Sequence, residues 1–210
     1  MIENKTCNLY RNLYDIIHPS ISRKNISNYK IVFKDNLIPI RVFYPKKEVT
    51  LKKIILYIHG EIVNYDIYDE LAKRTDNIVF LLDYTKNNKV NDCINMLKYI
   101  YEEIKKYNLS INDITIMGDF EGSNIIFDIF SNLDENYFKE NIKVLIEPTS
   151  IKLLDNSVFI TSYKSEINDE NMKLYQTEED IIGFINDTNL MAKECIFKII
   201  NDEINYEGSM

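Results

Sequence analysis

Five short, nearly continuous apolar runs recur along the chain, and helical patterns separate most of them. The runs cover residues 54–58, 78–82, 114–117, 144–146 and 158–160. Strands of this kind are typical of a parallel sheet that helices cover on both faces. Helical patterns at 88–107, at 124–133 and from Thr188 onward supply such covers. The alternation predicts a doubly wound, mostly parallel α/β sheet with right-handed crossovers.

The N-terminal part of the chain has a different pattern. Residues 30–33 and 39–44 read as two strands joined by a short polar turn, which predicts an antiparallel hairpin. Residues 4–18 carry an apolar stripe at helical spacing, and Pro19 would end that helix. At 210 residues, we expect a single domain over 1–210, with residues 1–28 as an N-terminal helical extension.

Charge and cysteine content exclude several functional classes. The formal net charge is −8, with no basic cluster, so we expect neither nucleic acid nor a membrane surface as a partner. The sequence shows no secretion signal and no run of 18 apolar residues, which predicts a cytoplasmic location. The three cysteines, Cys7, Cys93 and Cys195, are too widely spaced for a zinc site or disulfide framework. We expect no metal and no cofactor.

A glycine-flanked turn follows the apolar run at 114–117. Residues 118–123 read Gly-Asp-Phe-Glu-Gly-Ser and lead into a helical pattern. A nucleophile elbow needs small residues around its central residue, because a strained strand-to-helix turn lifts that side chain above the sheet. Gly118 and Gly122 meet this need, but Phe120 stands where a nucleophile would be. The pattern predicts an elbow without its hydroxyl, with the Phe120 ring largely buried.

Taken in order, these segments resemble the α/β-hydrolase fold, and most closely its acetyl-esterase or hormone-sensitive-lipase branch, over residues 29–203. Residues 38–45 are similar to the branch's second strand, "i-x-v-R-v-Y-x-P". Residues 55–60 resemble the strand that leads into its His-Gly-Gly-Gly oxyanion loop, and 118–123 resemble "G-D-S-A-G-G". Four of the five glycines fall on motif positions of the branch: Gly60, Gly118, Gly122 and Gly183.

The resemblance implies a catalytic triad, and this chain departs from it at each position. In the family a serine attacks the ester, a histidine takes its proton, and an acid orients the histidine. The alignment places Phe120 at the serine, Ser165 at the acid and Ile182 at the histidine. None of these three side chains can perform its step, so the triad positions are vestigial.

The loop that would stabilise the oxyanion also departs from the family. A carboxylate at Glu61 would oppose the negative charge that develops on an oxyanion. By resemblance, the vestigial oxyanion loop and elbow consist of His59, Gly60, Glu61, Gly118, Glu121 and Gly122. The segment that usually forms part of the cap is reduced to residues 148–156, which predicts a minimal cap and a small or open pocket.

Other side chains could replace the missing chemistry. Ser123 is a weak rescue candidate for the nucleophile, since serine in a first helical turn usually bonds backbone groups and no base accompanies it. Neither histidine of the chain falls where a triad base belongs. Cys93 lies on an apolar helix face, which favours an inert thiol. Asp119 and Glu121 could form an acid–base pair, but their spacing predicts that they bind different donors.

Two functional hypotheses follow. The first is a non-catalytic α/β-hydrolase-fold protein, a pseudoenzyme that acts as a binding or regulatory module for an unidentified small molecule or protein. The alternative is a carboxylesterase that hydrolyses small acyl esters by an altered mechanism, although fold alone does not establish activity. The resemblance also implies a homodimer through the last strand and helix, residues 172–203.

Overall fold

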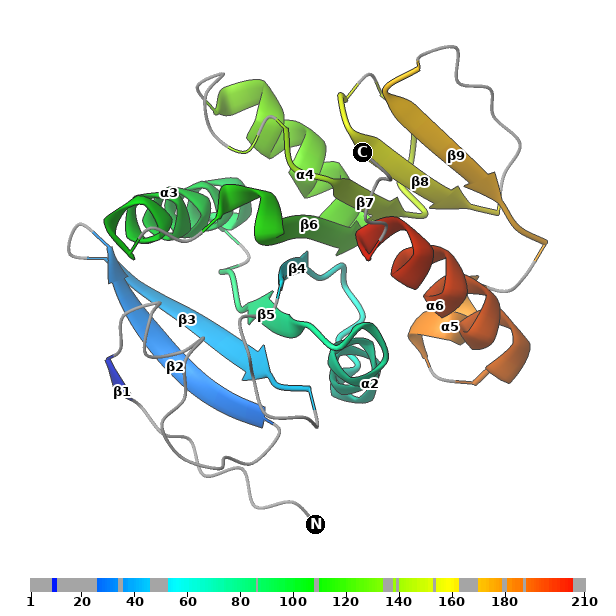
Figure 1. Cartoon of the computed structure of the whole chain (residues 1–210), viewed down its shortest axis with the longest axis horizontal. Coiled ribbons are helices and arrows are strands. Elements are labelled where there is room, and N and C mark those ends of the chain that lie inside the picture. The colour runs from blue at the N-terminus through cyan, green and yellow to red at the C-terminus, as the bar shows by residue number, and fades with distance from the viewer. Residues whose placement is uncertain are drawn as a thin grey trace.

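The computed structural model describes residues 9–10, 26–33, 36–45, 53–85, 87–107, 110–133, 138, 140–152, 154–162, 170–178, 181–186 and 188–205. Its nine-stranded sheet has the order β1-β2-β3-β5-β4-β6-β7-β8-β9 (Figure 1). The strands are Leu9–Tyr10 (β1), Ile26–Phe33 (β2), Asn36–Phe43 (β3), Ile54–Ile58 (β4), Ile78–Leu82 (β5), Ile114–Asp119 (β6), Lys143–Ile146 (β7), Ser157–Thr161 (β8) and Met172–Gln176 (β9). The helices are Tyr65–Thr75 (α2), Lys89–Tyr107 (α3), Glu121–Asn132 (α4), Ile181–Ile185 (α5) and Leu190–Ile204 (α6), with a 3₁₀ turn at Ile111–Asp113.

Strands β4 to β9 form the parallel part of the sheet, and β4 is the central strand of the whole sheet. β4 pairs parallel with both β5 and β6, and β6 through β9 continue in parallel register. All five predicted apolar runs lie in these strands, and every residue of β4 and β5 is buried. The predicted doubly wound, mostly parallel α/β architecture is therefore confirmed.

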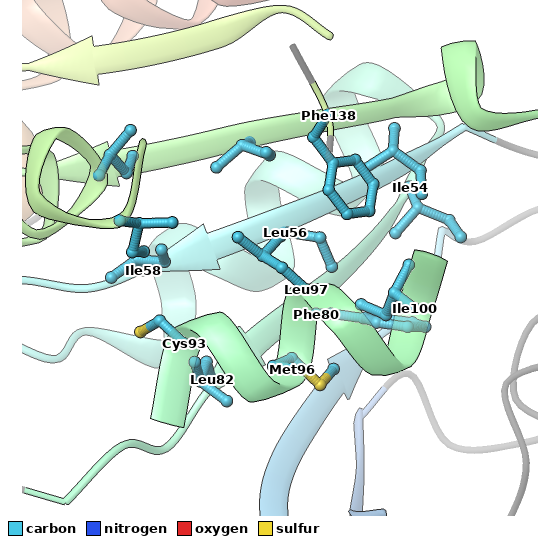
Figure 2. Close-up of a cluster of buried hydrophobic side chains, with 14 of the residues drawn as sticks. Ile54, Leu56, Ile58, Phe80, Leu82, Cys93, Met96, Leu97, Ile100 and Phe138 are labelled. Carbon is cyan, nitrogen blue, oxygen red and sulfur yellow. The ribbon is translucent and has the colours of Figure 1, made fainter. Parts of the chain in front are cut away.

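Two helical layers cover the sheet because successive strand side chains point to opposite faces. On one face, Ile54, Leu56 and Ile58 pack with α3 and α4. Figure 2 shows this cluster, in which Cys93, Met96, Leu97 and Ile100 of α3 lie against side chains of β4 and β5. On the other face, Ile55 and Tyr57 pack with α2, α5 and α6. The two layers hold the carboxyl ends of the strands in fixed relative positions.

Side-chain caps fix where the covering helices begin. Asn64 precedes α2, and its Oδ1 accepts a hydrogen bond from the Asp66 amide at 3.1 Å. Asn189 precedes α6 in the same way and accepts from the Ala192 amide at 3.1 Å. Such caps satisfy amides that have no partner inside the helix. No helix among the described residues combines the length and apolar character needed to span a bilayer.

The N-terminal hairpin is antiparallel as predicted, and longer than the two apolar patterns. β2 and β3 pair over eight residues each, from Ile26 opposite Phe43 to Phe33 opposite Asn36. β3 then joins the main sheet by antiparallel pairing with β5. The register places Asn28 directly opposite Arg41 and Lys30 opposite Pro39. Polar side chains therefore share one face of this hairpin.

The predicted helix over residues 4–18 is wrong where the structure describes it. Leu9 and Tyr10 form β1, which pairs parallel with Tyr29 and Lys30 of β2. Unpaired backbone groups along the edge of β2 give these two residues hydrogen-bond partners, and this outweighs a short apolar stripe. Residues 26–28 of the predicted helical extension are also strand. The remaining residues of 1–28 lie outside the described part of the chain.

Candidate functional site

The turn between β6 and α4 has the backbone geometry of an elbow. Phe120 lies between the two elements with φ 42° and ψ −111°. A positive φ is unfavourable for a bulky residue and persists only where neighbouring structure imposes it. The Phe120 amide donates to the Ile146 carbonyl at 2.8 Å, which ties the turn to β7. The Phe120 ring is half-buried against the apolar cluster on the sheet face that α2, α5 and α6 cover. It is less buried than the sequence predicted.

Close packing around the turn requires its two glycines. A Cβ atom on Gly122 would overlap the Ile58 carbonyl oxygen and lie 3.0 Å from the His59 carbonyl carbon. A Cβ atom on Gly118 would lie 2.8 Å from the Gly122 carbonyl carbon. The start of α4 therefore presses directly on the ends of β4 and β6. This contact, rather than the central side chain, holds Phe120 in its strained conformation.

A buried carboxyl group braces the turn from below. Asp119 is 1% exposed; its Oδ2 accepts from the Tyr57 hydroxyl at 2.9 Å, and its Oδ1 accepts from the Gly60 amide. Burial raises the pKa of Asp119 to about 7, although both hydrogen bonds act in the opposite direction. The Gly60 amide, at the oxyanion-loop position, is thus bonded to an internal carboxyl group. The sequence did not predict this contact.

Ser123 and Glu121, which follow the turn, both have partners. Ser123 is fully buried, and its hydroxyl lies within donating distance of the carbonyl oxygens of Gly118, at 2.8 Å, and Ile146, at 3.0 Å. A hydroxyl held in this way is not presented to a substrate. Glu121 forms an ion pair with Lys89, whereas Asp119 bonds inside the core. The two carboxylates therefore bind different donors, as the sequence predicted.

The loop after β4 is fixed through His59. Its Nδ1 lies 2.6 Å from the Gly60 carbonyl oxygen, so this nitrogen carries the proton in the contact. The His59 ring stacks on Tyr84 with centroids 4.5 Å apart, and the Tyr84 hydroxyl donates to the His59 carbonyl at 2.5 Å. Glu61 is exposed. These contacts give His59 a bracing role. Nε2, the other ring nitrogen, takes part in none of them.

The resemblance aligned two further positions, Ser165 and Ile182, with the triad. Ile182 is 55% exposed on α5, and Ser165 lies outside the described residues. Cys93 is buried against the sheet, and burial raises the pKa of its thiol well above the ordinary value. Within the described part of the chain, no group of three or more histidine, cysteine, aspartate or glutamate side chains could hold a metal ion.

A second polar region, which sequence reasoning missed, lies beside the His59 loop. It is a cavity of about 210 Å³, here called the β2–β3 pocket, and its polar lining includes Asn28, Lys30, Arg41, His59, Tyr65 and Asp83. The hairpin brings the first three together, while α2 supplies Tyr65 and the end of β5 supplies Asp83. Only the cross-strand register reveals this grouping, and the sequence patterns did not extend β2 far enough to fix it.

No family model matches the sequence, and no curated protein matches it. Among solved structures, the chain is similar to the Francisella virulence factor BioJ, with 18% identity and a TM-score of 0.66, over 88% of this chain and 86% of that one. It is also similar to an arylesterase, with 20% identity and a TM-score of 0.49, over 63% of this chain and 47% of that one. A further similar structure is the esterase LipW from Mycobacterium marinum, with 15% identity and a TM-score of 0.46, over 59% of this chain and 43% of that one. The chain spans about half the length of these two esterases. Likeness at these identities concerns the fold.

Proposed function

The chain has an α/β-hydrolase fold, and we propose that it acts without catalysis, as a binding or regulatory module. The observation that carries this proposal is the turn at Phe120. Its strained strand-to-helix backbone supports the alignment of Phe120 with the attacking serine of the family. A phenyl ring has no lone pair or acidic proton, and it cannot form an acyl-enzyme.

The contacts around Phe120 support the proposal further. In acyl transfer, free backbone amides stabilise the charge on the tetrahedral oxygen. Here the Gly60 amide donates to the buried carboxyl group of Asp119. The next residue of the loop, Glu61, would bring a negative charge toward the same place. Both features oppose stabilisation of an oxyanion.

The alternative remains a carboxylesterase of altered mechanism, the class of activity for which the similar arylesterase is named. That function would need a nucleophile and a base in place of those missing at Phe120 and Ile182. Ser123 would have to leave two carbonyl partners inside the core before it could attack. This requirement makes the alternative the second choice.

Ester hydrolysis separates the two hypotheses directly. The purified protein is incubated with p-nitrophenyl acetate and, separately, with a serine-reactive fluorophosphonate, alongside the Ser123→Ala variant and heat-unfolded protein. The proposal predicts release of nitrophenol no faster than with the unfolded control, and no labelling. Turnover above that control would overturn it, and loss of turnover in Ser123→Ala would identify the nucleophile.

Three further expectations belong to the same proposal. A single domain over 1–210 and a cytoplasmic location are proposed, the latter supported by the unpaired thiols of Cys93 and Cys195. A homodimer through β9 and α6 is proposed because β9 lies at the end of the strand order, where an exposed edge favours pairing. Light scattering on the eluting peak of a size-exclusion column measures the dimer directly.

A further inference from the structure

We infer that the β2–β3 pocket binds a small monoanionic carboxylate, which Arg41 holds through its guanidinium group. This inference rests on the proposed function, because it identifies the ligand class of the binding module. The pocket adjoins the vestigial elbow through His59: the neighbouring Gly60 backbone lies against Asp119 and Phe120. Its volume of about 210 Å³ is below the range of roughly 300–1,000 Å³ usual for drug-sized ligands, so the ligand is small.

Arg41 is held in position before any ligand binds. Its guanidinium carbon lies 3.8 Å from the centroid of the Tyr65 ring, and Tyr65 in turn stacks on Phe43 with centroids 6.4 Å apart. The Arg41 Nε donates to the Asn28 Oδ1 at 2.6 Å across the hairpin. Stacking fixes the plane of the guanidinium group, and the Nε bond fixes its rotation within that plane. Preorganisation of this kind lowers the entropic cost of binding.

The contacts that fix Arg41 use one face and one edge of its guanidinium group. Nε donates to Asn28 along one edge, and the two Nη atoms form the fork at the end of the guanidinium group. Two parallel N–H donors match the oxygens of a carboxylate in a bidentate arrangement. Among the described residues, no carboxylate lies within ion-pair distance of Arg41 or Lys30. The fork therefore lacks an anionic partner within the described part of the protein.

The charges on the pocket lining favour a monoanion. Lys30 and Arg41 are cations and Asp83 is a carboxylate, so the lining has a net charge of +1 when His59 is neutral. A dianion such as a phosphate monoester would leave one negative charge uncompensated near Asp83. Val63 and Ile40 also line the pocket and provide apolar surface for the body of the ligand. These features together specify a carboxylate on a short apolar frame.

Benzoate is the probe, because it is a monoanion of suitable size, with benzamide as its uncharged counterpart and phenyl phosphate as the dianion. Calorimetry and two-dimensional NMR measure binding to the full chain. Benzoate is expected to bind with a Kd below about 10 mM and to shift the amides of residues 28–30, 39–41 and 59, whereas benzamide binds at least tenfold more weakly, by roughly the worth of a charged hydrogen bond. Equal affinity for benzamide, or tighter binding of phenyl phosphate, would contradict a monocarboxylate site.

Variants test whether Arg41 makes the contact. Arg41→Met should weaken benzoate binding about tenfold or more, and Arg41→Lys should weaken it as well, because lysine keeps the charge but lacks the fork. Tyr65→Leu removes the ring on which Arg41 stacks but keeps the guanidinium group, and it should cause a smaller loss. Lys198→Met removes an exposed cation of α6 that does not line the pocket, and it should leave the Kd unchanged. If Arg41→Met fails to fold, Arg41→Lys and Tyr65→Leu still carry the test.

Unchanged affinity in Arg41→Lys and Tyr65→Leu would overturn the inference, as would a lack of benzoate binding up to about 10 mM. The proposed function is tested separately, because its failure would be seen as ester hydrolysis and not as a change in benzoate binding. Hydrolysis together with benzoate binding would overturn only the non-catalytic proposal. Absence of both would overturn only the ligand assignment.

Discussion

The elbow and the β2–β3 pocket lie on either side of one short loop, yet they differ in what they retain. At the elbow, a strained backbone conformation holds Phe120, whose side chain has no reactive group. In the pocket, ordinary strand backbone presents oriented polar groups, chief among them Arg41. Strained geometry and reactive side chains are therefore specified by different residues. The strain at the turn reflects the close packing around it, whereas ligand binding depends on the polar side chains of the pocket.

Substitution of Gly122 tests whether packing alone imposes the strained turn. Gly122→Ala should destabilise the fold by more than about 3 kcal/mol, because the new Cβ would overlap the backbone of Ile58. Urea unfolding measures the change. Asp128→Ala on the exposed side of α4 is the matched control, and it should lie within about 0.5 kcal/mol of the natural protein. A tolerated Gly122→Ala would mean that α4 does not press on β4 as described.

The second effect concerns the buried acid under the turn. Asp119 has a pKa of about 7 in the folded protein and a lower one when unfolded, so the folded state binds more protons between about pH 4 and 7. The free energy of unfolding should therefore fall as pH rises through that window, relative to Asp119→Asn, by on the order of 4 kcal/mol. Urea unfolding at several pH values measures both proteins. Parallel pH profiles would show that Asp119 titrates normally.

A smaller effect is expected from the serine beside the elbow. Ser123→Ala removes a buried hydroxyl that lies against the Gly118 and Ile146 carbonyls, and should cost about 1–3 kcal/mol of stability. Thermal and urea unfolding give this number. Ser131→Ala serves for comparison, since Ser131 is an exposed residue of α4 whose hydroxyl bonds a single carbonyl. A stability cost in Ser123→Ala no greater than in Ser131→Ala would contradict a bracing role.

The smallest effect is on activity. Phe120→Ser should leave hydrolysis of p-nitrophenyl acetate at the level of the unchanged protein, because a lone hydroxyl without base and acid is barely activated. Hydrolysis near that of ordinary esterases would reveal an unrecognised base. Adding Ser165→Asp and Ile182→His tests the residue-by-residue alignment, and this triple variant should exceed the single one if the alignment is correct.

Much of the sheet could be predicted because its strands are apolar throughout. β4 and β5 match the predicted runs residue for residue, since both are buried on two faces and have polar neighbours at their ends. β2 was underestimated because its residues Ser27 and Asn28 are polar and half-buried, and so interrupt the apolar pattern. β1 was missed because its partner, the edge of β2, comes later in the sequence.

The candidate site divides in the same way. The elbow was predictable because Phe120 and the two glycines that permit its close packing lie within six consecutive residues. The contact of Asp119 with Tyr57 and Gly60 was not, because it joins residues about sixty positions apart through the pairing of β4 with β6. The grouping around Arg41 depends on a hairpin register that apolar patterning does not determine.

The packing of α4 against β4 has a consequence for how such a protein can evolve. Change at position 120 is constrained by what the side chain does, whereas change at Gly118 or Gly122 is constrained by whether the chain folds. A lineage can therefore lose its reactive group in a single substitution while its architecture persists under separate selection. The same independence leaves position 120 open to a different side chain, because Gly118 and Gly122 hold the backbone around it.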